Sequence, residues 1–225
     1  MAGEGPEPGT FLALLSDGDR DELLGLGGVR RFARGEYLMR QGELGERILI
    51  LLDGHTKASC VDARGSETVL SFRGPGDILG ELTFNQAEPR SSDVIALEPV
   101  DARAISAREF RDYLLRRPTA ALTLIDVISG RFKDANHKRV QFGDLDTIGR
   151  IAARLVELCE RYGDRTASGT TIRLPITQAD LGSWTAASPA GVASALQAMR
   201  ARGWIQTGRR RITVLDLEAL KQPPG

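Results

Sequence analysis

Closely spaced turn signals between Val29 and Ser106 constrain the fold of this chain more than any other feature of its sequence. Strand-like runs such as Arg47–Leu52 and Glu67–Phe72 lie between the turns. Short strands at this spacing are typical of an antiparallel barrel or sandwich. The strongest hairpin signal is Asp53-Gly54, because apolar runs flank it on both sides. The turn signals are Arg34-Gly35, Gln41-Gly42, Asp53-Gly54, Arg64-Gly65 and Gly74-Pro75-Gly76.

The segment Gly74–Asp93 has the composition of an anion-binding cradle. Gly80 allows a ligand to approach the backbone, and the helical turn expected to begin at Gly80-Glu81 would direct free N–H groups at an anion. Arg90 adds a two-pronged donor that suits a phosphate. Because the Glu81 carboxylate would repel a phosphate, it must accept hydrogen bonds from a neutral group such as a ribose hydroxyl. These residues together predict a site for a nucleotide with a single phosphate.

The pattern Gly80-Glu81 followed by Arg90-Ser91 resembles the phosphate-binding cassette of cyclic-nucleotide-binding domains, and the earlier glycine turns resemble the β-roll of those domains. The resemblance implies that the glutamate holds the ribose 2′-hydroxyl, that the arginine holds the cyclic phosphate, and that the serine and backbone amides support it. The residues alone leave a second interpretation open, a surface turn with a structural Glu–Arg ion pair. The expected ligand-binding residues are Gly80, Glu81, Leu82, Arg90, Ser91 and Asn136.

The segment before the β domain is predicted to form a tail followed by two short helices. Residues 1–10 are acidic and rich in proline and glycine, which predicts a flexible tail rather than a secretory signal. The segment Phe11–Leu26 is predicted to form two short helices, with Asp17 and Asp19 as candidate caps of the second. No apolar run approaches the roughly 20 residues of a membrane helix, so we expect no membrane partner. The two cysteines lie far apart in the sequence, so we expect free thiols in a reducing cytoplasm.

A long helix is predicted for Thr119–Phe142. Ser106 and Glu109 form a capping-box pattern for the helix before it, and Pro118 separates the two helices. The 4-3 spacing of apolar residues in the long helix favours a homodimer contact, and the alternative is burial in a monomer core. The dimer seam is predicted to be Ala121, Ile125, Ile128, Phe132, Ala135, Arg139 and Phe142. The set expected to pack on the β domain is Leu122, Leu124 and Val127.

Gly143 is predicted to be the hinge between two domains. Asp144 is a candidate N-cap for a helix over Asp146–Tyr162. A polar loop over Gly163–Thr171 and a short strand over Ile172–Leu174 are expected to follow.

The segment after this strand predicts a helix-turn-helix followed by a wing. Thr177 can cap a first helix over Gln178–Trp184, and Ser188-Pro189 can begin a second one that ends at Gly203. A basic hairpin over 204–215 would place three successive arginines, 209 to 211, against DNA phosphates. Residues 147–225 carry 11 Lys+Arg against 6 Asp+Glu, a balance of +5, whereas residues 1–146 carry 19 against 24, a balance of −5. This asymmetry favours DNA binding by the C-terminal part.

The order of β-roll cassette, long helix and winged helix resembles the Crp/Fnr family of bacterial transcription regulators over nearly the whole chain. The resemblance implies an α+β fold with an antiparallel β-roll, a dimerisation helix and a winged helix-turn-helix. It also implies an effector-gated dimer that binds a near-palindromic DNA site, with RNA polymerase as a further candidate partner. The domains expected are a tail at 1–10, an effector-binding domain at 11–117, a dimerisation helix and hinge at 118–143 and a DNA-binding domain at 144–225.

Two departures from the family pattern affect specificity. The recognition helix of well-known members begins with Arg and Glu and carries a further Arg, and the matching positions here are Pro189, Ala190 and Ser194. Specificity would then come from Ser188, Ser194 or Gln197, from thymine-methyl contacts or from DNA shape. Cyclic-AMP receptors place two polar residues over the adenine, whereas Ala135-Asn136 stands here. The DNA-binding residues expected are Thr177, Ser188, Pro189, Ala190, Ser194, Gln197, Arg209, Arg210 and Arg211.

Three functions are consistent with the sequence. The first is a transcription regulator gated by a cyclic nucleotide, with cyclic AMP as the leading effector. The second is a regulator of the same type that needs no nucleotide or responds to another ligand, and the third is a nucleotide-binding subunit that acts on a protein. No catalytic constellation is evident, and Cys60, Cys159, His55 and His137 form no metal-ligand spacing. We therefore expect neither an enzyme nor a metal or other cofactor.

Overall fold

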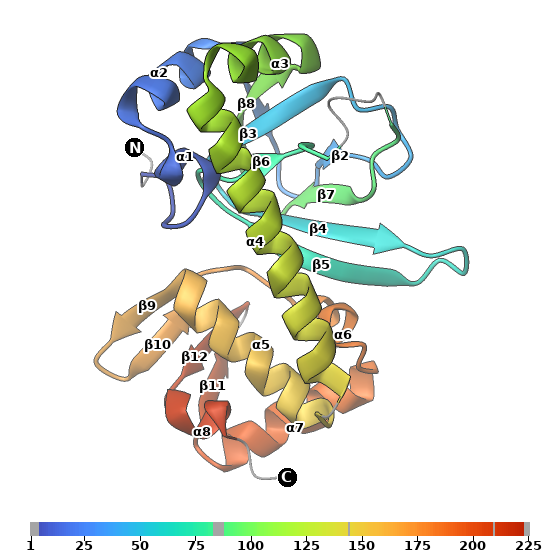
Figure 1. The fold of residues 1–225 in the computed structure, drawn as a ribbon. Coiled ribbons are helices and arrows are strands. Elements are labelled where there is room, and N and C mark those ends of the chain that lie inside the picture. Colours follow the sequence, from blue (N-terminus) through green and yellow to red (C-terminus); the bar gives the residue numbers. More distant parts are fainter. Residues whose placement is uncertain (1–4, 83–87, 144, 209, 223–225) are drawn as a thin grey trace. The chain divides into compact units, whose positions relative to one another are not determined.

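The computed structural model describes residues 5–82, 88–143, 145–208 and 210–222, apart from the side chains of Arg139, Gln141 and Phe142. The chain divides into two compact units, Met1–Ala135 and Asn136–Gly225 (Figure 1). Among the described helices, none is long and apolar enough to cross a membrane.

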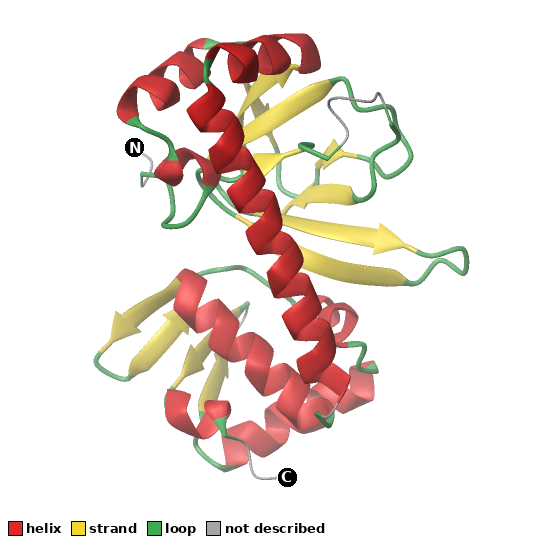
Figure 2. Ribbon diagram, viewed as in Figure 1, coloured by secondary structure: helices red, strands yellow, loops and turns green. Residues whose placement is uncertain are grey.

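Two antiparallel four-stranded sheets form the first unit, as the turn pattern predicts (Figure 2). The first sheet has the order β1 (Gly28–Phe32), β8 (Val100–Ser106), β3 (Arg47–Asp53) and β6 (Ile78–Leu79). The second has the order β2 (Tyr37–Met39), β7 (Asp93–Ala96), β4 (Thr56–Val61) and β5 (Glu67–Arg73). The prediction of a hairpin at Asp53-Gly54 is wrong, because β3 and β4 belong to different sheets. Gly54, at φ 76°, turns the chain from one sheet to the other, and a Cβ there would lie 2.2 Å from the Pro99 carbonyl oxygen.

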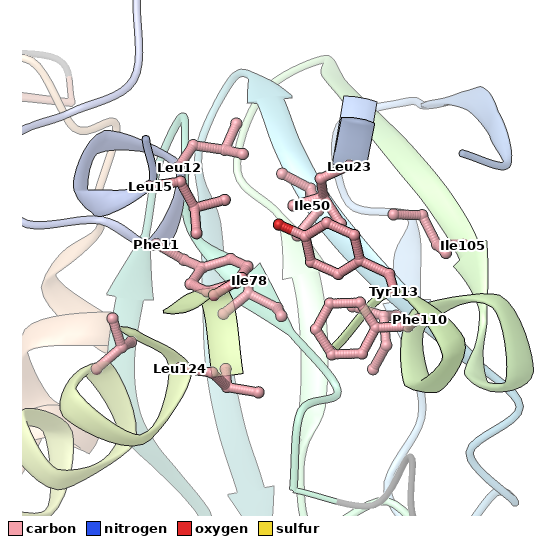
Figure 3. Packing of buried hydrophobic residues seen from close by; sticks show 13 residues of the cluster. Phe11, Leu12, Leu15, Leu23, Ile50, Ile78, Ile105, Phe110, Tyr113 and Leu124 are labelled. Atoms are coloured by element: carbon pink, nitrogen blue, oxygen red, sulfur yellow. The ribbon is translucent and has the colours of Figure 1, made fainter. Parts of the chain in front are cut away.

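Strand β3 separates the two apolar cores of the first unit. Ile48 and Ile50 are buried against the helices, whereas Leu49 and Leu51 are buried between the sheets, as the two-residue period of a strand requires. The helical side of this core comes from α1 (Phe11–Leu14), α2 (Asp17–Gly25), α3 (Ala107–Arg116) and the start of α4 (Pro118–Gly143), and it is shown in Figure 3. A layer of helices therefore covers one sheet, and the other sheet covers its opposite face.

The helix caps are partly as predicted. Ser106 and Glu109 form the expected capping box of α3, and Pro118 begins α4. The candidate caps Asp17 and Asp19 are wrong, because Ser16 has extended backbone and accepts the Asp19 N–H, while both aspartates lie inside α2. The buried Asp19 instead accepts a hydrogen bond from the Thr119 hydroxyl at 2.9 Å.

Helix α4 packs on the first unit through Ala120, Leu124 and Val127, which lie on one face. The prediction that Leu122 joins this face is wrong, because it is 62% exposed. Leu122 lies two residues from both Ala120 and Leu124, which is about 200° around a helix and therefore on the opposite side.

Part of the segment expected to be a flexible tail is described and makes hydrogen bonds with the β domain. The Glu7 N–H donates to the Pro75 carbonyl at 2.8 Å, and Thr10 is buried. The Glu7 carboxylate lies 3.0 Å from Nε2 of His55, whose Nδ1 lies 2.5 Å from Glu98.

The second unit is a four-stranded antiparallel sheet with helices. Its sheet order is β11 (Ile205–Gly208), β12 (Arg211–Val214), β10 (Gly169–Ile172) and β9 (Gly163–Thr166). Its helices, besides the end of α4, are α5 (Thr147–Tyr162), α6 (Gln178–Thr185), α7 (Pro189–Ala201) and α8 (Leu217–Lys221).

Two predictions for the second unit are wrong. The N-cap of α5 is Asp146, whose carboxylate accepts the Gly149 N–H at 2.7 Å, and the predicted cap Asp144 lies outside the described residues. The segment 163–171 is not a polar loop but mostly the β9–β10 hairpin, and β10 ends at Ile172. Polar residues are compatible with strands here because β9 is an edge strand and almost wholly exposed.

Candidate functional site

The backbone of Arg90 is fixed by the loop that contains Gly42. The Arg90 N–H donates to the Glu43 carbonyl at 2.8 Å, and the Gly42 N–H donates to the Arg90 carbonyl at 2.9 Å. These bonds direct the arginine side chain inward, so that Arg90 is only 8% exposed. Its guanidinium donates to the carbonyl of Gly80 at 3.0 Å and to the carbonyl of Arg47.

Gly80 and Arg90 therefore lie together, as the cassette pattern predicts. Gly80 has φ 83°, and a Cβ at this position would lie 2.4 Å from Nη1 of Arg90. Only glycine combines this backbone conformation with such a close approach. Burial lowers the pKa of Arg90 from its ordinary value, and the negative charge of Glu81 opposes that shift.

Glu81 is held by an arginine of α4 that the sequence analysis did not single out. Nη1 of Arg131 donates to the Glu81 carboxylate at 2.6 Å and to the Ile78 carbonyl at 3.1 Å. Nη2 of Arg131 donates to the Asp77 carboxylate at 2.9 Å. The side chains of Asp77 and Glu81 are 5% and 9% exposed, so one guanidinium compensates two largely buried carboxylates.

The cavity beside Arg90 is small. Its volume is about 180 Å³, whereas pockets that enclose small molecules measure roughly 300–1,000 Å³. Arg90 is the one expected ligand-binding residue among those that line this cavity, and residues 83–87 of the cassette lie outside the described part of the chain. The lining residues are Leu38, Met39, Arg40, Glu43, Leu44, Glu46, Arg47 and Arg90.

The other expected ligand-binding residues are more exposed. Leu82 is 61% exposed, and Ser91 is also exposed, next to the inward-pointing Arg90. Asn136 is exposed on α4, about one and a half helical turns after Arg131. The helical turn expected from Gly80-Glu81 cannot be followed, because residues 83–87 lie outside the described part of the chain.

Arg131 and Asp77 are the residues that sequence reasoning missed. Arg131 lies one helical turn before Ala135, the first residue of the Ala135-Asn136 pair. It is the last arginine of α4 before that pair. Asp77 lies between the Gly-Pro-Gly turn and Gly80. A search for a cation opposite the two cassette carboxylates could have identified the pair.

An apolar stripe is exposed on α4. Leu122, Ile125 and Phe132 are 62%, 57% and 67% exposed, and their spacing of three and seven residues places them along one side. Ile128 of the predicted seam instead packs partly against the core of the first unit. The side chains of Arg139 and Phe142, also in that seam, lie outside what the structure describes.

The second unit contains the two predicted helices of a helix-turn-helix. Thr177 and Asp180 form a capping box at the start of α6, which ends with Ala186 in the left-handed region at φ 52°. Ser188 caps α7 by accepting the Gly191 N–H at 3.1 Å, with Pro189 in the first turn. The exposed residues of α7 include the predicted contacts Pro189, Ala190, Ser194 and Gln197.

The predicted wing is the β11–β12 hairpin. Gly208 pairs with Arg211, so the turn has two residues, and Arg210 adopts φ 54° there. Arg210 and Arg211 are exposed, and Arg209 lies outside the described residues. The hairpin thus presents cations to solvent at the position that the sequence predicts.

Comparisons with known proteins agree with both units. Residues 29–117 match the cyclic nucleotide-binding domain family, and residues 149–222 match the Crp-like helix-turn-helix domain family. A CRP-like cAMP-activated global transcriptional regulator of Mycobacterium tuberculosis is 28% identical over 84% of each chain. The cAMP-activated global transcriptional regulator CRP of Salmonella typhimurium is 25% identical over 83% of this chain and 89% of that protein.

Solved structures show the same fold. The c-di-GMP responsive global regulator CLP of Xanthomonas campestris has a TM-score of 0.78 at 18% identity, over 88% of this chain and 99% of that one. FixK2 of Bradyrhizobium japonicum has a TM-score of 0.76 at 18% identity, over 87% of this chain and 96% of that one. With both domain families in this order, the chain belongs to the Crp/Fnr family of DNA-binding transcription regulators.

Proposed function

We propose that the chain is a homodimeric transcription regulator whose DNA binding is controlled by a cyclic nucleotide, with cyclic AMP as the first candidate. The observation that carries the proposal is the cradle in which the Arg90 guanidinium donates to the Gly80 carbonyl. Glu81 follows Gly80 in the sequence, and its negative charge favours the charged form of Arg90. A cyclic phosphate would accept from the arginine, and a ribose hydroxyl would donate to the glutamate. The names of the relatives from Mycobacterium and Salmonella support this choice of effector.

Control of DNA binding would act through Arg131. In the structure, the Arg131 guanidinium donates to the carboxylates of Glu81 and Asp77. A nucleotide that engages Glu81 changes the partners available to Arg131, and therefore changes what holds α4 to the cassette. A ligand can shift the balance between two helix arrangements only through such a difference in affinity. RNA polymerase would then be a further partner of the DNA-bound form.

The proposed dimer would form through α4. Leu122, Ile125 and Phe132 expose large apolar side chains along one side of α4, and such exposed apolar groups often mark an interface. We expect Phe132→Glu to convert a dimer to a monomer in sedimentation velocity. Leu115→Glu is the matched control, since Leu115 is 74% exposed but lies on α3. A wild-type monomer, or equal effects of the two substitutions, would reject this interface.

A second candidate is a regulator that binds another ligand or none. Two observations favour it, namely the ion pair that already occupies Glu81 and the alanine at position 135, which cannot donate to a base. The Xanthomonas regulator of the same fold is described as responsive to c-di-GMP, which supports considering a different effector.

Calorimetric titration of the full chain tests the proposal. Cyclic AMP should release heat with the wild type and with Arg108→Ala, a control at an exposed arginine of α3. It should release none with Arg90→Ala, and Arg90→Lys, which keeps the charge but loses the fork, should bind more weakly. Equal heats for wild type and Arg90→Ala would reject the site. Heat with cyclic di-GMP alone would favour the second candidate.

A further inference from the structure

The exposed side of α7 carries no long cationic or acidic side chain in its first half, and the helix is described along its whole length. Its buried face is formed by Val192, Ala195, Leu196 and Met199. The exposed residues of its first nine positions present methyl and methylene groups, one hydroxyl and one carboxamide. These residues are Pro189, Ala190, Ala193, Ser194 and Gln197.

The arginines of this region point elsewhere. Arg200 is the first arginine of α7, and its Nη1 donates to the Thr207 hydroxyl of β11 at 3.2 Å. The guanidinium of Arg202 lies 5.0 Å from the ring centroid of Trp204. Both cations therefore interact with the wing side of the unit, at the C-terminal end of α7. Neither is placed among the exposed residues of its first half.

Base pairs differ in what such a surface can recognise. In the major groove, guanine is read by Arg or Lys, and cytosine donates from N4 to Glu or Asp. The stretch Pro189–Met199 contains none of these four residue types. Adenine is read by Gln or Asn through N6 and N7, and the thymine methyl is read by apolar contact. Gln197 supplies the first of these chemistries, and the methyl groups of Ala190 and Ala193 supply the second.

We infer that α7 reads A·T base pairs in the major groove, with Gln197 on an adenine and Ala190 and Ala193 on thymine methyl groups. The inference rests on the DNA-binding function and specifies the class of its target. Residues 190 to 197 span about 10.5 Å of helix axis, which corresponds to about three base-pair steps of 3.4 Å. Short side chains also allow the backbone of the helix to lie close to the base edges. The half-site should therefore contain a core of about three A·T pairs under α7.

Selection from a random duplex library with the full chain, at low salt and with or without cyclic AMP, tests this inference. The enriched half-sites should carry A·T pairs at the positions under α7. Replacing each contacted thymine by uracil removes one methyl group and keeps the base pairing. Each replacement should weaken binding about fourfold, the value expected for one buried methyl-sized group. Gln197→Ala should remove the preference for adenine at one position per half-site, whereas Gln222→Ala, at an exposed glutamine beyond α8, should leave the selection unchanged.

Each outcome of the selection either supports or overturns the inference that α7 reads A·T base pairs. Enrichment of G·C pairs under α7, or equal binding of thymine and uracil duplexes with unchanged selection by Gln197→Ala, would overturn the inference. Salt-dependent retention of DNA without any base preference would also overturn it, but would leave DNA binding intact. No retention of any duplex at low salt would reject the DNA-binding function itself.

Discussion

The cassette and α7, the proposed reading helix, differ in how far their proposed functional residues are exposed. In the cassette, Arg90 is buried against carbonyl groups and Glu81 is paired with Arg131. On α7 and the wing, the proposed DNA-contacting residues that the structure describes, such as Ala190, Gln197 and Arg211, are exposed. A ligand of the cassette must exchange existing interactions for its own, whereas DNA meets a surface that is already displayed. The first region is therefore suited to the proposed switching and the second to the proposed reading of DNA.

The largest effect is expected from the buried pair of the cassette. Arg131→Met leaves Asp77 and Glu81 without this cation and should cost about 3 kcal/mol of stability in the first unit. Both tryptophans, Trp184 and Trp204, lie in the second unit. Urea unfolding should therefore shift in circular dichroism and remain nearly unchanged in tryptophan fluorescence.

A control substitution separates this effect from a general loss of charge. Lys221→Met removes the cation of an exposed pair with Glu218 and should cost no more than about 0.5 kcal/mol. If Arg131→Met lowered the free energy of unfolding no more than Lys221→Met does, the Arg131 guanidinium would not compensate the Asp77 and Glu81 carboxylates.

A smaller and pH-dependent effect is expected at His55. Burial of its ring opposes protonation, but the hydrogen bonds to Glu7 and Glu98 outweigh it and raise the pKa of His55 to about 9. Because the folded pKa lies above the unfolded value near 6.5, the stabilisation is complete below pH 6.5 and is lost as the pH rises through 9. Allowing for solvent around the partly exposed Glu98, we expect a loss of about 2 kcal/mol.

The difference in unfolding free energy between wild type and His55→Gln, measured by circular dichroism from pH 6 to 10, isolates this term. The difference should shrink as the pH rises, since only the wild type loses a proton-linked interaction. A difference that is constant across this range would show that His55 is not charged in the fold.

A stability effect smaller than those at Arg131 and His55 is expected at the start of α7. Ser188→Ala removes the acceptor for the Gly191 N–H and should cost about 1 kcal/mol in the second unit. Tryptophan fluorescence should report this shift, and Ser188→Asn, which keeps an acceptor, should largely restore the stability. Equal midpoints for the alanine variant and the wild type would mean that this cap does not stabilise the reading helix.

Local signals predicted the framework of both units well. Ser106 with Glu109, Thr177 and Ser188-Pro189 mark helix starts through backbone chemistry that the neighbouring residues alone determine. Asp53-Gly54 misled because a turn residue specifies a local bend and not the sheet in which the next strand pairs.

The sequence predicted which residues make up the cassette, but it did not predict the ion pair between Glu81 and Arg131. Gly80 and Arg90 are ten residues apart, and their contact follows the motif. Arg131 lies 50 residues from Glu81, so the ion pair depends on how α4 packs on the sheet. Leu122 was misplaced for a related reason, since apolar character does not tell which side of a helix faces the core.

The most direct test of the whole account measures DNA affinity with and without cyclic AMP. Fluorescence anisotropy with a duplex selected by the full chain should show at least about tenfold tighter binding when cyclic AMP is present, within the usual range of coupling between sites. Arg90→Ala should bind the same duplex with one affinity in both conditions. Identical affinities of the wild type with and without cyclic AMP would contradict control by this nucleotide.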